Sequence, residues 1–343
     1  MSDLNDQKSY RVLVIGVGSI GERHARCFLK SGRARVSICE TNERLCNDVG
    51  QRYEIEDGYT DLNSALSQPH DAAVIAVPAD LHIPIARKAV DAGLHVLIEK
   101  PLAVAMDGID ELQRAVRGAN LVAAVGYVYR AHPALEAMRK AIQDGALGLP
   151  VQLGVVAGQN FPTYRPAYRE SYYTSRARGG GAVQDALTHL INAAEWLVGP
   201  IDRVVADADH RLIADVDVED VVNLLARHGN VIASYSLNQY QSPNEVTITV
   251  VCEHGTARFE YHNHRWRRML RPDEAWQDEP AQGLERDTLF IRQADSFLDS
   301  IAGRSAPLCS LEEGLQSLRV NLAIFSSIEA QNWQPVCNHT ISV

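Results

Sequence analysis

Three glycines near the start of the chain have the spacing of a turn that binds phosphate groups. They follow a short apolar run that begins at Val12, and a stretch of helical character continues to Leu29. The turn reads Gly16-Val17-Gly18-Ser19-Ile20-Gly21. In such a turn the first glycine permits a sharp reversal, the second lets a pyrophosphate approach the backbone, and the third allows close packing of helix on strand. The pattern predicts a dinucleotide site, and an ordinary strand-to-helix turn is the alternative.

An acidic residue stands about twenty residues further on, where such sites hold the adenosine ribose. The second predicted strand ends in Glu40. Its carboxylate can accept hydrogen bonds from ribose hydroxyls and would repel a 2'-phosphate, which favours NAD over NADP. Arg44, one helical turn later, keeps NADP open, and a solvated strand end is the alternative interpretation.

Polar residues also follow two later strands of the same region. One strand ends at Val77-Pro78, with His82 close behind, and the next ends in Glu99-Lys100-Pro101. Proline disfavours helical backbone angles in the residue before it, so Lys100 is presented at the strand end. A lysine there could donate a hydrogen bond to the oxygen of an alcohol or carbonyl substrate. A surface lysine is the alternative.

A second group of polar residues lies on one predicted helix. Gly179-Gly180-Gly181-Ala182 precedes that helix, which extends to about Leu197. Asp185, His189 and Asn192 occupy the face opposite to an apolar stripe formed by Leu187, Leu190, Ile191 and Ala194. Asp185 and His189 are one turn apart and can interact, and a histidine titrates near neutrality, as a general base must. A solvated polar face is the alternative.

Weaker signals surround this helix. Gln159 and Asn160 end a strand and could contact sugar hydroxyls. Residues 161–178 are rich in Tyr and Arg, which suits either a lid over an acidic or nucleotide-linked sugar or an oligomer contact. His262 and His264 have metal-like spacing, but a strand would put both on one face without a third ligand, so we expect no metal.

The elements that must position these residues change character along the chain. Short apolar runs alternate with helical stretches in the first third, which predicts a parallel sheet with helices on both faces. β-rich runs joined by turn signals then follow, with helical patterns near the end, which predicts an α+β domain with a mainly antiparallel sheet. We place the dinucleotide-binding domain at residues 1–129 and the substrate and oligomerisation domain at 130–343.

Together, the glycine turn, the Glu99-Lys100-Pro101 triplet and the glycine run before Asp185-x-x-x-His189 resemble the glucose-fructose oxidoreductase/inositol dehydrogenase/rhizopine catabolism (Gfo/Idh/MocA) family. The resemblance implies an N-terminal Rossmann domain and a C-terminal domain with a large open, mainly antiparallel sheet, used in homodimers or homotetramers.

The resemblance also implies roles for single residues. Lys100, Asp185 and His189 would be catalytic, and Pro78, His82 and Glu99 would help to seat the nicotinamide and its ribose. Two departures exist: Ala79-Asp80 replaces a Pro-Asn pattern, and Asn192 stands where inositol dehydrogenases tend to have an aspartate.

Composition narrows the function classes. The chain has 343 residues and a formal net charge of -10, so it lacks the basic surface that nucleic-acid binding requires. It has no apolar run long enough to span a membrane, no basic and apolar leader, and six scattered cysteines, which together predict a cytoplasmic protein.

The sequence therefore predicts an NAD-dependent oxidoreductase that transfers a hydride between the nicotinamide and a secondary hydroxyl or ketone of a sugar, polyol or derivative. Two alternatives stay open. One is an NAD-dependent glycosidase of the same fold, and the other is a nonenzymatic NAD-binding regulator, against which the retention of Lys100, Asp185 and His189 argues.

Overall fold

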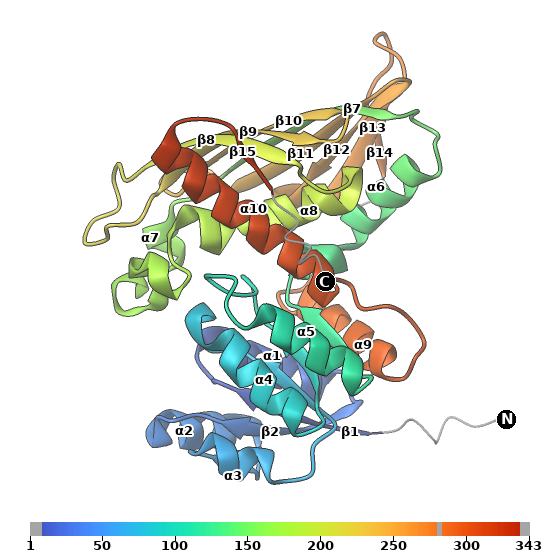
Figure 1. Cartoon of the computed structure of the whole chain (residues 1–343). Coiled ribbons are helices and arrows are strands. Elements are labelled where there is room, and N and C mark those ends of the chain that lie inside the picture. The colour runs from blue at the N-terminus through green and yellow to red at the C-terminus, as the bar shows by residue number, and fades with distance from the viewer. Residues whose placement is uncertain (1–8, 280–282, 337–343) are drawn as a thin grey trace, which may run out of the picture. The chain divides into compact units, whose positions relative to one another are not determined.

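A computed structural model describes residues 9–279 and 283–336 of the chain. These residues form two compact units (Figure 1). The first comprises the described residues up to Ala131 together with Glu285–Gly314, and the second comprises His132–Leu284 and the described residues from Leu315 onward.

The first unit is built on a six-stranded parallel sheet with the order β3-β2-β1-β4-β5-β6. Its strands are β1 (Tyr10–Ile15), β2 (Ala34–Cys39), β3 (Gly58–Tyr59), β4 (Ala72–Ile75), β5 (His95–Ile98) and β6 (Ala123–Val125). The predicted parallel sheet is confirmed. The last strand ends at Val125, and the chain then enters a 3-10 turn at Val128–Ala131.

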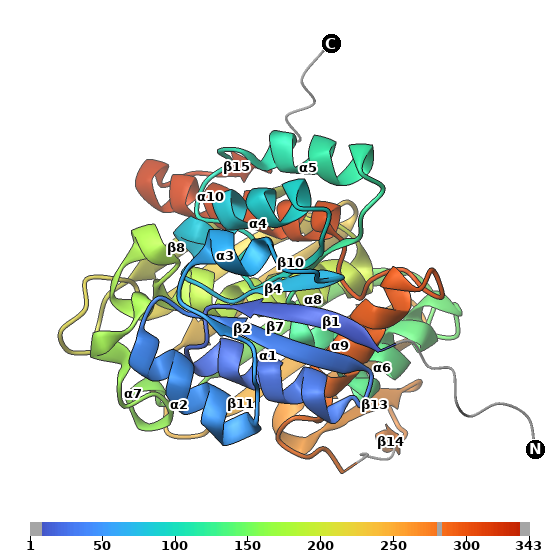
Figure 2. The same cartoon turned by 90° about the horizontal axis from the view of Figure 1, so that it is seen from below.

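Helices cover both faces of this sheet, as its continuous apolar strands require (Figure 2). The helices α1 and α2 lie on one face, and α4 and α5 lie on the other. The bounds are α1 (Ser19–Lys30), α2 (Glu43–Tyr53), α3 (Leu62–Leu66), α4 (His82–Asp91) and α5 (Ile109–Gly118). All strands run in one direction, so the segments after β1, β2, β4 and β5 gather at one edge of the sheet.

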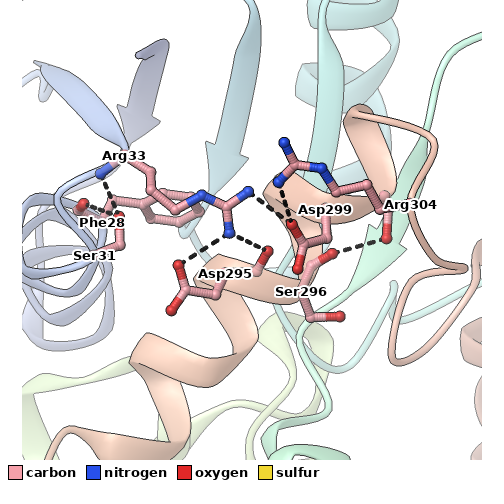
Figure 3. Close-up of polar contacts among 8 residues, drawn as sticks. Phe28, Ser31, Arg33, Asp295, Ser296, Asp299 and Arg304 are labelled. Atoms are coloured by element: carbon pink, nitrogen blue, oxygen red, sulfur yellow. Dashed lines mark hydrogen bonds and ion pairs between the residues drawn. The ribbon is translucent and has the colours of Figure 1, made fainter. Parts of the chain in front are cut away.

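One helix from late in the chain also belongs to the first unit. Helix α9 (Thr288–Ile301) packs beside α1, with Phe28 and Phe297 edge to face at 6.4 Å between ring centroids. Arg33 donates to the backbone and side-chain oxygens of Asp295 and to Asp299, as Figure 3 shows.

The packing of α9 differs from the division expected from the sequence, which placed residues 130–343 in the second domain. Ala294 and Leu298 join a core that includes Leu97 of β5 and Ala124 of β6. Residues 285–314 therefore complete one face of the parallel sheet, because α1 and α2 lie over its other half. The sequence pattern alone gave α9 a helical period but no partner.

The second unit contains a nine-stranded sheet with the order β14-β13-β12-β11-β7-β10-β9-β8-β15. Its strands are β7 (Pro150–Gly158), β8 (Arg203–Asp209), β9 (Val221–His228), β10 (Val231–Asn238), β11 (Glu245–Cys252), β12 (Gly255–Glu260), β13 (Arg265–Met269), β14 (Gln277–Glu279) and β15 (Gln334–Pro335). Only β7 and β10 pair in parallel, and the other neighbours are antiparallel. The predicted mainly antiparallel sheet is confirmed.

Helices of the second unit lie on one face of its sheet (Figure 1). They are α6 (Pro133–Gln143), α8 (Thr188–Val198) and the part of α10 (Leu311–Ala330) from Leu315 onward. Burial alternates along β9 and β10, so every second side chain packs under these helices. Side chains on the other face are exposed, among them Leu225 of β9 at 49%, Ile232 of β10 at 47% and Val156 of the adjoining β7 at 60%.

Within the described ranges, no helix is both long enough and apolar enough to cross a membrane. The same ranges contain no group of three or more His, Cys, Asp or Glu side chains that could hold a metal ion. His262 lies in a 3-10 turn (Tyr261–Asn263) and His264 follows it with a positive φ of 50°. The expectation that both lie on one strand is wrong, because the chain turns there between β12 and β13.

Candidate functional site

The glycine turn joins β1 to α1, and its three glycines meet different surroundings. Gly16 has a φ of +82°, and a Cβ there would lie 2.8 Å from the Ala76 carbonyl oxygen. A Cβ on Gly21 would collide with the Gly16 carbonyl, so these two glycines are required by the fold itself. A Cβ on Gly18 would meet no protein atom within 4 Å. The turn therefore leaves open space above Gly18.

This open space adjoins the first turn of α1. Gly18 is the N-cap, and no side chain caps the helix. Gly18 and Ser19 are exposed and Ile20 is half-buried, so the first backbone N–H groups of the helix are left for a ligand or water. A helix N-terminus with free N–H groups favours an anion such as a pyrophosphate.

Glu40 follows β2 and lies against the same turn. Its carboxylate accepts the backbone N–H of Val17 at 3.1 Å and that of Asn42 at 3.0 Å. The Thr41 hydroxyl also donates to it at 3.3 Å. A carboxylate has about four acceptor positions, so these three contacts leave capacity for a ribose hydroxyl. Arg44 has a side chain that is 91% exposed and lies 3.9 Å from the carboxylate of Asp48.

The segment after β5 is fixed from within. Glu99 is 5% exposed, and its carboxylate accepts His24 Nε2–H at 2.6 Å and the backbone N–H of Lys100 at 3.1 Å. Gly126 makes room for this carboxylate, because a Cβ there would lie 2.7 Å from Glu99 Oε1. Lys100 is half-buried at the edge of the sheet where the glycine turn also lies. Glu99 therefore fixes the backbone at Lys100 through its hydrogen bond with that N–H.

His82 holds the other side of this segment. It is 1% exposed, and its Nδ1 lies 2.9 Å from the Pro101 carbonyl oxygen while its Nε2 lies 2.8 Å from that of Val77. A neutral imidazole donates to one of these oxygens at a time. Burial lowers the pKa of His82, although the two carbonyl groups oppose this effect. His82 thus ties the segment after β4, which includes Pro78, to Pro101.

Asp185 and His189 belong to the second unit, at a change of helical geometry. Val183–Leu187 forms a π-helical turn, and α8 continues from Thr188. Such turns are frequent at functional sites. Both side chains are partly exposed, and the predicted stripe of Leu187, Leu190, Ile191 and Ala194 is buried. The Asp185 carboxylate accepts a hydrogen bond from the Tyr172 hydroxyl at 2.7 Å.

Asn192 is not on the same exposed face. It is 1% exposed, and its amide donates to Ser317 Oγ of α10 at 3.0 Å. The Asn160 amide is also used internally, because it caps α7 (Phe161–Tyr164) by accepting the N–H and hydroxyl of Thr163. Gln159 is half-buried and its side chain makes no hydrogen bond within the described residues. Of these three predicted sugar contacts, Gln159 alone keeps its polar atoms for a ligand.

The Tyr- and Arg-rich segment, residues 161–178, packs as an arm around a small core. Phe161, Tyr168 and Tyr173 cluster with Ile213, Val216 and Val218. Arg169 pairs with Asp215 at 2.6 Å, and Arg176 pairs with Glu219 at 3.1 Å. Two of the arginines considered for binding an acidic sugar thus neutralise carboxylates of the same unit.

Residues 10–127 match the sequence profile of the Gfo/Idh/MocA oxidoreductase family with an NAD-binding Rossmann fold, and residues 135–258 match the profile of its C-terminal domain. The chain belongs to this family. The resemblance seen in its motifs is thereby confirmed.

Several Gfo/Idh/MocA relatives are known as dehydrogenases. Levoglucosan dehydrogenase of Pseudarthrobacter phenanthrenivorans is 25% identical, with 96% of this chain and 98% of the relative covered. Inositol 2-dehydrogenase of Acidothermus cellulolyticus is 30% identical over 64% of this chain and 63% of its own. A structure of levoglucosan dehydrogenase with NADH and levoglucosan has the same fold, with a TM-score of 0.88, 24% identity, and coverage of 96% and 100%.

The surroundings of the glycine turn fit the dinucleotide of a Gfo/Idh/MocA protein. The fold explains Gly16 and Gly21, but it gives no reason for a glycine at position 18, where a side chain would have room. A ligand that lies directly against the backbone of Gly18 would explain why a glycine stands there. Gly18, Ser19, Ile20 and Glu40 are the residues that would hold the pyrophosphate and the ribose.

Three residues in this Gfo/Idh/MocA chain escaped the sequence analysis. His24 lies in α1 and joins Glu99, Tyr172 joins Asp185, and Glu219 accepts the Val183 N–H at 3.1 Å. His24 sits one turn beyond the glycine motif, a position that could have drawn attention. Tyr172 stood in the aromatic segment without a partner, and Glu219 had no signal at all.

Proposed function

We propose that this protein is an NAD-dependent dehydrogenase that oxidises a secondary hydroxyl of a neutral sugar, polyol or sugar derivative to a ketone, and reverses that reaction. The observation that carries the proposal is the glycine turn, whose second glycine has open space above it next to an uncapped helix start and Glu40. Family membership and the dehydrogenase relatives support the same activity.

Catalysis is assigned to Lys100, Asp185 and His189. Lys100 would donate a hydrogen bond to the reacting oxygen and stabilise its alkoxide character. His189 would take the proton of the substrate hydroxyl as general base, and Asp185 would orient it. Bound NAD would supply the hydride acceptor. In the reducing direction the histidine returns the proton to the oxygen.

The choice of NAD over NADP is supported by Glu40. Its carboxylate lies against the turn that would hold the pyrophosphate, so a 2'-phosphate at the ribose would meet negative charge. Glu99, Pro78 and His82 are assigned an indirect part, since His82 and Glu99 fix the backbone on both sides of Lys100.

A neutral substrate is favoured because Arg169 and Arg176 already pair with Asp215 and Glu219. The relatives named for levoglucosan and inositol also act on uncharged sugars or cyclitols. The test is a panel of sugars, anhydrosugars and cyclitols with NAD, followed through NADH formation. Cleavage of an aryl glycoside without net NADH formation would instead support the glycosidase.

The assignment of the catalytic residues is tested by Lys100→Ala and His189→Ala. Each should lower turnover by about 100-fold or more while NAD still binds. Lys140→Ala is the control, because Lys140 is an exposed lysine paired with Asp144 in another helix. Full turnover by either catalytic variant would refute the role given to that residue.

We also propose a cytoplasmic homodimer or homotetramer. The five described cysteines are free and buried, which suits a reducing compartment. Val156, Leu225 and Ile232 form an apolar patch on the sheet face that no described helix covers. Ile232→Arg should yield a smaller species in light scattering, whereas Leu212→Arg, at a loop residue that is 64% exposed, should not.

A further inference from the structure

The Tyr172 side chain connects the arm to Asp185. Its hydroxyl donates to Asp185 Oδ1 at 2.7 Å, across 13 positions of sequence. The ring is 37% exposed, so the tyrosine adds little to the core of the unit. Its hydroxyl thus makes a specific polar contact from a ring that is partly exposed to solvent.

The residue that follows Tyr172 is anchored in the small core of the arm. The next residue, Tyr173, is 1% exposed, packs against the tilted ring of Phe161 with 4.2 Å between ring centroids, and donates to the side chain of Gln239. Burial raises the pKa of the Tyr173 phenol, as do the nearby carboxylates of Asp185, Glu219 and Asp220, so it remains a protonated donor.

The glycine run before the π-helical turn allows the arm to pack closely against the start of the helix. A Cβ on Gly180 would collide with the Tyr173 carbonyl oxygen, and one on Gly181 would press on the Glu219 carboxylate. Glu219 itself accepts the Val183 N–H and an N–H of Arg176. The arm and the start of the helix thus form one packed assembly in which the Tyr172 hydroxyl has a defined place.

We propose that Tyr172 is a positioning residue that acts through Asp185. Its hydroxyl occupies one carboxylate oxygen, which fixes the rotamer of Asp185 and directs the other oxygen to the remaining donors of the site. The neighbouring His189, one turn along the helix, is such a donor. This inference rests on the proposed function, in which Asp185 orients the general base.

The Tyr173 phenol lies among the carboxylates of Asp185, Glu219 and Asp220, and Glu219 is itself paired with Arg176. The Tyr172 hydroxyl donates directly to the Asp185 carboxylate. Tyr172→Phe removes this hydroxyl and keeps the ring.

The first test is a double-mutant cycle with Tyr172→Phe and Asp185→Asn. Tyr172→Phe should lower kcat about 10-fold with little change in KM in the natural enzyme, and less than about 2-fold in the Asp185→Asn background. Tyr164→Phe is the matched control, because Tyr164 is an exposed tyrosine of the same arm whose hydroxyl has no described hydrogen bond. Equal losses in both backgrounds would overturn the proposal.

The second test does not depend on turnover. In NMR spectra of the full chain with NAD, the imidazole ring signals of His189, assigned with His189→Gln, should shift in Tyr172→Phe and stay in place in Tyr164→Phe. Unchanged signals in Tyr172→Phe would overturn the inference. If no sugar in the panel is oxidised, the proposed function fails, and these spectra still decide whether Tyr172 acts on this helix.

Discussion

Two buried glutamates, one in each unit, fix the backbone near them by different means. Glu99, at the end of β5, accepts the N–H of Lys100 and is joined by His24 from α1. Glu219 lies in the irregular segment between β8 and β9, and it accepts the N–H of Val183 and a hydrogen bond from Arg176. Each carboxylate fixes the backbone next to a residue to which we assign catalysis.

The difference lies in what brings the partners together. In the first unit, parallel strands with intervening helices place β1, β5 and the start of α1 at one edge, so the Glu99 contacts follow from a regular topology. In the second unit, Glu219 and Arg176 both lie outside the sheet and the long helices. Their contact depends on the packing of one arm. A regular topology thus brings together the partners of Glu99, and the packing of individual side chains brings together the partners of Glu219.

The largest effects should come from the glycines. Gly21→Ala should destabilise the first unit by about 3 kcal/mol or more, because the Cβ collides with backbone. Gly18→Ala should leave stability within about 1 kcal/mol and weaken NAD about 100-fold. Calorimetry and NAD titration measure both, with Gly118→Ala, where a Cβ has open space, as control. Normal NAD affinity in Gly18→Ala would refute the site.

The glutamates themselves provide the next test. Glu99→Gln should lower the stability of the first unit by about 2 kcal/mol and weaken NAD binding, because a buried charge-assisted contact is lost. Glu219→Gln should leave NAD affinity unchanged and lower kcat/KM for the sugar about 10-fold.

All four tryptophans, Trp196, Trp266, Trp276 and Trp333, lie in the second unit, so their fluorescence reports its unfolding alone. Glu219→Gln should lower the Tm detected by tryptophan fluorescence. Glu99→Gln should mainly lower the Tm that rises when NAD is added. A shift of the tryptophan-detected Tm by Glu99→Gln and not by Glu219→Gln would contradict this comparison of the two units.

The same contrast explains how much the sequence could predict. The glycine turn, Glu40 and Lys100 were found because each stands at the end of an apolar run, and parallel strands put such ends together. The helix of Asp185 was predicted from its stripe, but Asn192 was expected on an exposed face and is buried, because α10 packs over that part of α8 and Ser317 accepts its amide. The Tyr172 contact had no local signal, since it depends on how the arm folds.

A smaller effect concerns cofactor choice. Glu40→Ala should weaken NAD about 10-fold and narrow the preference for NAD over NADP, because the ribose loses an acceptor and the 2'-phosphate loses a repelling charge. Glu43→Ala is the control, an exposed acid three residues further in the first turn of α2. Kd values for both cofactors give the ratio, and a ratio unchanged by Glu40→Ala would remove Glu40 from the ribose site.

The smallest effect is the pH dependence of stability, to which both units contribute through a buried histidine. Burial lowers the pKa of His82 in the first unit and of His228 in the second, where Nδ1 faces the Gly199 carbonyl oxygen and Nε2 faces the Tyr235 hydroxyl. Burial lowers the pKa of the half-buried His70 as well.

Because these histidines bind protons more weakly when folded, their contribution is complete above about pH 6.5 and declines as the pH falls below that value, by up to about 1.4 kcal/mol per pH unit for each. Carboxylates with a lowered pKa, such as Asp287, lose their contribution only below about pH 4, outside this window. The tryptophan-detected Tm should therefore fall between about pH 7 and pH 5.5, and His228→Gln should flatten that slope while His82→Gln leaves it unchanged. If His82→Gln flattened the slope instead, the stability of the second unit would depend on the first unit, and the two units would unfold together.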